Sequence, residues 1–97
     1  DLLWVVSPNG GEPHQVTRLT HSIQSAFSWQ PRGEAIAFIS DNSVMRCHVV
    51  TGECERLTVR SSEAPSGDAV VWSPDGKQIA FMREIEGWRQ LFTVAVA

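Results

Sequence analysis

Residues 72–81 read WSPDGKQIAF, and residues 29–38 read WQPRGEAIAF. Six of the ten positions carry the same residue, and the two segments lie 43 positions apart. Each segment places a Pro-x-Gly turn between a tryptophan and the run Ile-Ala-Phe. Because proline presets φ and glycine supplies a positive φ, each segment is a predicted hairpin. The chain is therefore built from a repeated unit.

The repeat extends beyond these two segments. The pattern Gly-Glu-x3-[Val/Leu]-Thr occurs at residues 11–17 and again 41 positions later, and LWVV at residues 3–6 resembles LFTV at residues 91–94. No stretch of eleven or more residues shows clear apolar helical periodicity, and five prolines interrupt most candidates. We expect an all-β chain with strands at residues 3–6, 14–19, 25–29, 35–39, 44–50, 53–58, 69–72, 78–83 and 90–96.

Repeats of 40 to 45 residues with four strands each are typical of β-propeller blades. We predict antiparallel four-stranded blades, with residues 1–20 as the end of one blade, 21–58 as a full blade and 59–97 as most of the next. The run AIAFI at 35–39 is apolar throughout, as in a sheet covered on both faces. Trp29 and Trp72 occupy the same blade position and are expected in the core between blades. Trp4 is expected either in the core against a missing blade or at an interface.

The motif WSPDGKQIAF, a following L-[WF]-x-V strand and G-G-E-P-x-Q-[VL]-T together resemble the repeat of TolB-like β-propellers. The resemblance covers nearly the whole chain. The same blade occurs in the propeller domains of prolyl-oligopeptidase-type peptidases and in oligogalacturonate lyases. The first copy departs from the repeat, because Gln30 and Arg32 replace the usual Ser and Asp. Asp75 is expected to accept N–H groups of its turn, and Arg32 cannot, so we expect a looser first turn.

Two cysteines, Cys47 and Cys54, flank the predicted turn at Thr51-Gly52. If Thr51-Gly52 is a two-residue hairpin loop, Cys47 faces Arg56 across the two strands. Cys54 is then only a diagonal neighbour of Cys47. A disulfide requires Cα atoms within about 7 Å. We therefore expect two free thiols, and a bridge in an oxidising compartment is the alternative.

The composition and the absence of several sequence motifs argue against certain partners, catalytic sites and metal sites. The net charge of −3 argues against nucleic acid as a partner. The sequence has no window of eighteen consecutive apolar residues, so we expect no membrane insertion. No G-x-S-x-G elbow or EF-hand loop occurs, and His14, His21 and His48 lack metal-ligand spacing. We therefore expect no catalytic residues, no metal and no cofactor in this chain, which we predict is not itself an enzyme.

The segment REIEGWRQ at residues 83–90 is the best candidate for a binding site. Residues 84–88 are predicted to form the loop between two strands, and Glu86, Trp88 and Arg89 combine acidic, aromatic and basic groups. Tryptophan and arginine are enriched at interface hot spots, so these three are candidate partner-binding residues. A solvated loop with Trp88 packed on its own blade is the alternative. The polar loop VRSSEAPSGD at 59–68 either adds to a binding surface or serves as a connector.

These expectations lead to three functional hypotheses. By the resemblance, the chain is a non-enzymatic TolB-like propeller segment that mediates protein–protein interaction in the bacterial periplasm. Alternatively, it is a piece of the propeller of a prolyl-oligopeptidase-type peptidase or an oligogalacturonate lyase. The third hypothesis is a self-assembling mini-propeller, in which copies of the chain bind one another and three copies close a six-bladed ring.

Overall fold

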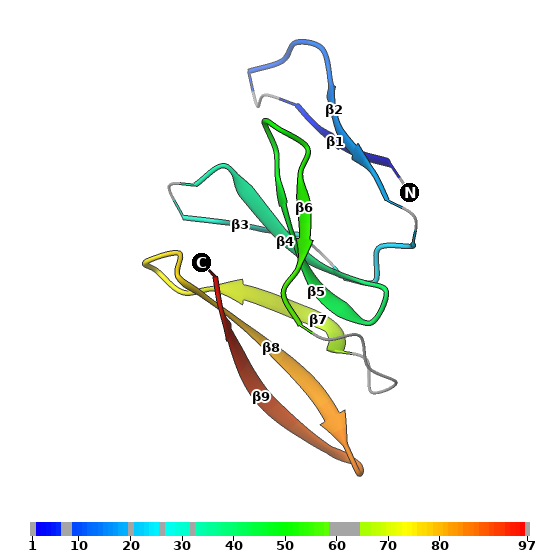
Figure 1. Ribbon diagram of the computed structural model, residues 1–97, viewed down its shortest axis with the longest axis vertical. Coiled ribbons are helices and arrows are strands. Elements are labelled where there is room, and N and C mark those ends of the chain that lie inside the picture. The colour runs from blue at the N-terminus through cyan, green and yellow to red at the C-terminus, as the bar shows by residue number, and fades with distance from the viewer. Residues whose placement is uncertain are drawn as a thin grey trace.

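The computed structural model describes residues 2–6, 9–19, 21–25, 27–31, 33–58 and 65–96, which contain nine strands and no helix. None of these residues belongs to a helix that could cross a membrane. The strands are β1 (Leu2–Val5), β2 (His14–Arg18), β3 (Ser28–Trp29), β4 (Ala35–Ser40), β5 (Ser43–His48), β6 (Cys54–Arg56), β7 (Pro65–Trp72), β8 (Gln78–Ile85) and β9 (Trp88–Ala95). They form three antiparallel sheets in the orders β1-β2, β3-β4-β5-β6 and β7-β8-β9, arranged one after another (Figure 1). The predicted all-β, blade-like fold is confirmed.

The two Pro-x-Gly turns are closed by equivalent backbone hydrogen bonds, but the positive φ predicted for both glycines is found at Gly76 and is wrong for Gly33. The Gln30 N–H donates to the Ala35 carbonyl at 2.9 Å, and 43 positions later the Ser73 N–H donates to the Gln78 carbonyl at 2.8 Å. Gly76 adopts φ +72, a conformation in which glycine carries no steric penalty. The side chain of Gln30, which replaces the serine of the second copy, donates from Nε2 to the Gly76 carbonyl at 3.2 Å. This substitution therefore links the two repeats.

Asp75 accepts within its own turn, as the sequence predicted. Its Oδ1 accepts the Lys77 N–H at 3.0 Å and the Ser73 hydroxyl at 2.5 Å. The Ser73 hydrogen bond, followed by that from the Lys77 backbone, lowers the pKa of Asp75 because both stabilise its charged form. Arg32, the residue predicted to loosen the first turn, lies outside the described residues.

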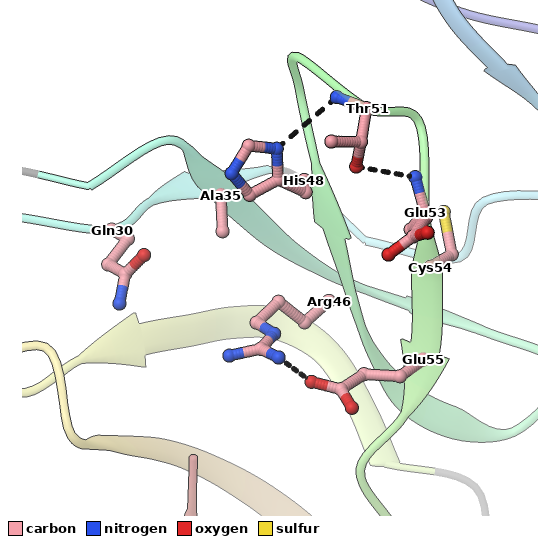
Figure 2. A pocket seen from close by; sticks show the side chains of 8 residues that line it. All are labelled: Gln30, Ala35, Arg46, His48, Thr51, Glu53, Cys54 and Glu55. Atoms are coloured by element: carbon pink, nitrogen blue, oxygen red, sulfur yellow. Dashed lines mark hydrogen bonds and ion pairs between the residues drawn. The ribbon is translucent and has the colours of Figure 1, made fainter. Parts of the chain in front are cut away.

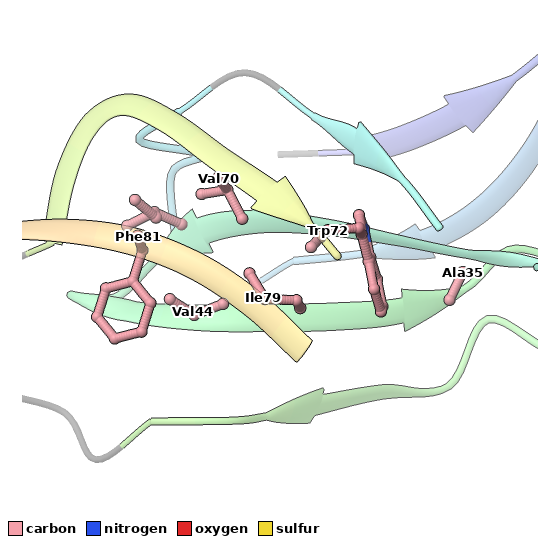
Figure 3. Close-up of a cluster of buried hydrophobic side chains, with 8 residues drawn as sticks. Ala35, Val44, Val70, Trp72, Ile79 and Phe81 are labelled. Carbon is pink, nitrogen blue, oxygen red and sulfur yellow. The ribbon is translucent and has the colours of Figure 1, made fainter. Parts of the chain in front are cut away.

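Strand β4 is the centre of the fold, because every one of its six residues is buried. Its alternate residues enter two different clusters. Ala35, Ala37 and Ile39 pack towards β7 and β8 with Val44, Val70, Trp72, Ile79 and Phe81 (Figure 3). Ile36 and Phe38 pack towards the first sheet with Leu3, Val16 and Cys47. The predicted coverage of both faces is confirmed, and burying a side chain such as Phe38 contributes about 1.5–3 kcal/mol.

The two repeated tryptophans have equivalent registers but different surroundings. Trp29 pairs with Ile36 and Trp72 pairs with Ile79. Trp72 is 6% exposed, and its Nε1 donates to the Ser28 carbonyl of the neighbouring sheet at 2.8 Å. Trp29 is 57% exposed. The prediction of a core position is therefore right for Trp72 and wrong for Trp29.

The difference follows from what lies beside each indole. The sheet that precedes Trp72 in the chain contains an inner strand, β3, which lies beside the Trp72 indole. The sheet that precedes Trp29 contains only β1 and β2 among the described residues. No strand equivalent to β3 covers Trp29 within this part of the chain. Its ring instead borders a pocket of about 200 Å³ lined by Leu3, Trp4, Val5, Val6, Phe27 and Ile36. Trp4, which shares this pocket, is half exposed at 50%.

Several strand limits differ from the prediction. The strand expected at 25–29 is reduced to β3, because the Ser25 hydroxyl accepts the Ile39 N–H at 2.8 Å in place of a backbone carbonyl. Strand β7 begins at Pro65, which pairs with Arg83, four residues earlier than predicted. Residues 65–68 therefore belong to a bulged strand and are not part of a loop, whereas residues 59–64 lie outside the described part.

The prediction of two free thiols is wrong, because Cys47 and Cys54 form a disulfide. The loop between β5 and β6 spans residues 49–53 and is longer than the two residues assumed. Its length places Cys47 directly opposite Cys54 and Met45 opposite Arg56, with the cysteine Cα atoms 4.0 Å apart. The two facing cysteines of adjacent strands are therefore well within the limit of about 7 Å beyond which a disulfide cannot form.

Candidate functional site

The candidate partner-binding residues lie at the tip of the β8–β9 hairpin. The segment 84–88 is not the predicted loop, because only Glu86 and Gly87 form the turn. Both have positive φ, 53 and 84, as a two-residue turn matching the strand twist requires. Ile85 and Trp88 are the last paired residues, so the candidate residues are held by a regular hairpin.

This hairpin is longer than its counterpart in the preceding sheet. In β4–β5, two residue pairs follow Phe38↔Met45 before the turn, whereas in β8–β9 four pairs follow Phe81↔Phe92. Two additional pairs extend a hairpin by about 7 Å. Figure 1 shows the β8–β9 hairpin projecting away from the rest of the molecule. Its tip therefore overhangs the neighbouring sheet.

The structure places the three predicted residues in different directions. Strand alternation puts Trp88 on the same face as Phe92, which packs towards β4 and β5. Arg89 lies on the opposite face, directly across from Glu84, and Glu86 is in the turn. Trp88 is 75% exposed despite facing the neighbouring sheet, because that sheet ends before it.

Arg83 is a residue of this hairpin that the sequence reasoning missed. It lies on the same face as Trp88, and its guanidinium carbon is 5.4 Å and 5.6 Å from the ring centroids of Phe81 and Phe92. Its Nε is shielded from solvent and has no hydrogen-bond partner among the described residues. An unsatisfied buried donor costs about 1–3 kcal/mol, and more when charged. The signal available in the sequence was the Phe-x-Arg-x-Ile alternation after the second turn.

We define the hairpin face as Arg83, Ile85, Trp88 and Gln90, two cross-strand pairs on one side of the hairpin. It runs from the Phe81–Phe92 pair, whose rings stack 5.8 Å apart, to the exposed indole at the tip. The face thus combines one cation, one amide and two apolar side chains.

A polar pocket of about 290 Å³ lies beside the β5–β6 hairpin (Figure 2), lined by Gln30, Ala35, Arg46, His48, Thr51, Glu53, Cys54 and Glu55. Three of its polar side chains, Arg46, His48 and Glu55, form ion pairs or hydrogen bonds. Arg46 pairs with Glu55, and His48 Nε2 lies 3.2 Å from a Glu34 carboxylate oxygen. His48 Nδ1 accepts N–H groups from the following loop, including that of Thr51 at 3.3 Å. The pocket is an ion-paired surface that lacks the geometry of a nucleophile and base.

The three histidines occupy separate environments. His14 begins β2, His48 belongs to the pocket, and His21 Nε2 lies 3.6 Å from Asp41 Oδ1. The described residues contain no group of three or more His, Cys, Asp or Glu side chains that could hold a metal ion.

Comparisons with known proteins agree with this architecture. No protein-family model matches the chain. It is 48% identical over 86 residues to Uncharacterized protein YidR of Escherichia coli (strain K12), covering 89% of this chain and 21% of that protein. It is 29% identical over 99 residues to a probable dipeptidyl-aminopeptidase B of Paracoccidioides lutzii, covering 87% of this chain and 11% of that protein.

The crystal structure of TolB from Acinetobacter baumannii superposes on 95% of the chain with a TM-score of 0.73 and 24% identity, and the chain covers 23% of it. The chain therefore has the fold of a TolB-like propeller segment with partial blades. It spans about a fifth of the length of YidR and of TolB.

Proposed function

We propose that the chain is a non-enzymatic segment of a TolB-like propeller that binds another protein through the overhanging β8–β9 hairpin. The observation that carries the proposal is the exposed Trp88. Other exposed apolar residues of this sheet, Val71 and Leu91, lie on the outer face, where the next blade of a propeller packs. Trp88 faces the blade that is already present and extends beyond its end, so blade packing does not account for it.

The chemistry of the hairpin supports a binding role. Tryptophan buries a large area with little loss of conformational freedom, and it is enriched at interface hot spots. The regular pairing up to Ile85↔Trp88 holds the indole on a rigid element, which lowers the entropic cost of docking. These are the properties of an anchor residue.

An oxidising cell-envelope location is part of this proposal. The Cys47–Cys54 disulfide supports it, because disulfides persist in oxidising compartments. The fold shared with TolB supports it by analogy only.

Site-specific photo-crosslinking of the intact protein in its own cells tests the proposal. A photoreactive residue at Trp88 is expected to give a discrete adduct with one other protein. The control position is Lys77, which is exposed in the turn at the other end of β8. Equal labelling from both positions, or no adduct from position 88, would contradict the proposal.

A second candidate is a peptidase propeller, which the likeness to dipeptidyl-aminopeptidase B favours. In that case the nucleophile lies elsewhere in the intact protein. A serine-directed fluorophosphonate probe separates the two hypotheses, because a peptidase is labelled at its active serine, whereas our proposal expects no labelling.

A further inference from the structure

Arg83 is a partly desolvated cation that forms no ion pair with any residue whose side chain the structure describes. The two rings beneath it, Phe81 and Phe92, take the place of water on one side of the guanidinium. The Arg83 side chain is half-buried, so it is not sealed from solvent. A carboxylate binds such a group more strongly than a fully hydrated one, because the local dielectric is lower and the hydrogen bonds are charge-assisted.

The rest of the hairpin face bears no charge. Ile85 and Trp88 form the pair at the tip, and Gln90 lies opposite Arg83. The charges of Glu84 and Arg89 are on the other side of the hairpin, where the two residues face each other. A ligand on the hairpin face therefore meets one cation next to an apolar tip.

We infer that the hairpin face binds an extended acidic segment of another protein, with one Asp or Glu carboxylate on Arg83 and one apolar side chain on Trp88. This inference rests on the proposed function and adds the chemistry of the partner. Arg83 and Trp88 are diagonal neighbours across the two strands, about 7–8 Å apart. Same-face side chains of an extended ligand have this same spacing, so the acidic and apolar residues of the ligand are two positions apart.

Peptide binding tests the inference directly. The probes are fluorescein-labelled eight-residue peptides of Ser and Gly that carry one Glu with one Leu two positions away. In matched peptides, Gln replaces Glu, or Leu is moved next to Glu. By fluorescence anisotropy, the intact protein is expected to bind the first peptide at least about tenfold more tightly than either matched peptide. Equal affinities, or no binding of the first peptide, would overturn the inference.

Matched variants of the hairpin locate the effect. Arg83→Met keeps the stem on the phenyl rings and removes the charge, so it is expected to abolish the tenfold preference for Glu over Gln. Arg89→Met removes the same charge from the opposite face and is expected to preserve it. If Arg83→Met unfolds the protein, Arg83→Lys serves instead. It keeps the charge but loses the planar fork, so an intermediate preference is expected, and an unchanged preference would count against Arg83.

The same variants separate this inference from the proposed function. If the adduct at position 88 forms equally well in Arg83→Met, the binding role of the hairpin stands and the acidic partner is ruled out. If no adduct forms from position 88 in the unaltered protein, the proposed function itself fails.

Discussion

The indole nitrogen of Trp72 donates a 2.8 Å hydrogen bond to the Ser28 carbonyl, and this contact joins two sheets that belong to successive repeats. The equivalent indole, Trp29, is 57% exposed. Two residues at the same position of one repeat thus differ because only one of them has an inner strand beside it.

Substitution of the two tryptophans should expose this difference. Trp72→Phe removes the donor to Ser28 and part of the buried ring, and it is expected to lower the free energy of unfolding by about 1–2 kcal/mol. Trp29→Phe is expected to change it by less than about 0.5 kcal/mol. Chemical denaturation of the 97-residue chain measures both. Equal effects would mean that the neighbouring inner strand does not determine how much each indole contributes.

Much of the fold could be predicted from the sequence, because turn chemistry and strand alternation are local properties. The Pro-x-Gly turns and the continuous apolar run at β4 directly predicted a sheet covered on both faces. The exposure of Trp29 could not be predicted, since it depends on which strands lie next to it. The Asp41-Asn42 turn, in which both residues have positive φ, was missed although Asp and Asn favour this conformation.

The candidate site could be predicted only in part. The segment around Trp88 was identified from its residue types, but the directions of its side chains depend on which residues form the turn. Because the turn is at Glu86-Gly87, Trp88 lies on the same face of the hairpin as Arg83, and Arg89 lies on the opposite face. The disulfide was missed for a similar reason, because the loop between Cys47 and Cys54 is longer than its glycine suggested.

The disulfide should contribute measurably to stability. Replacing both Cys47 and Cys54 with serine releases an eight-residue loop, for which chain-entropy estimates give a loss of about 2.5 kcal/mol. Comparison of urea midpoints with and without reductant checks this value. Complete maleimide labelling of both thiols in the native protein without reductant would show that the bridge is absent.

Asp75 should make stability depend on pH in the acidic range. Its pKa is lowered in the folded state from 3.8, so the unfolded chain binds the proton more readily. The contribution of Asp75 is therefore complete above the unfolded pKa and is lost as the pH falls through the folded value. Thermal unfolding of the protein and of Asp75→Asn should differ most above about pH 5 and converge towards about pH 2. A constant difference across this range would contradict the assignment.

Arg56 and Arg46 should differ in their contributions to stability. Arg56 contacts the Asp41 carboxylate at 2.8 Å and the buried Ser43 hydroxyl at 2.7 Å, and the Asp41 side chain is only 10% exposed. Arg56→Met is therefore expected to cost about 1–2 kcal/mol. Arg46 pairs with Glu55, whose side chain is 49% exposed, and Arg46→Met is expected to cost at most about 1 kcal/mol. Urea denaturation should rank them in this order, and the reverse ranking would contradict it.

Shortening the β8–β9 hairpin tests most directly whether its overhang is a binding surface. Deleting Glu84, Ile85, Trp88 and Arg89 removes two residue pairs and leaves Glu86-Gly87 as the turn, which restores the length of the β4–β5 hairpin. The shortened protein is expected to unfold within about 1 kcal/mol of the original, because the deleted pairs lie beyond the neighbouring sheet. By interferometry it should no longer bind the protein captured at position 88. Binding of that protein with unchanged affinity would contradict the account.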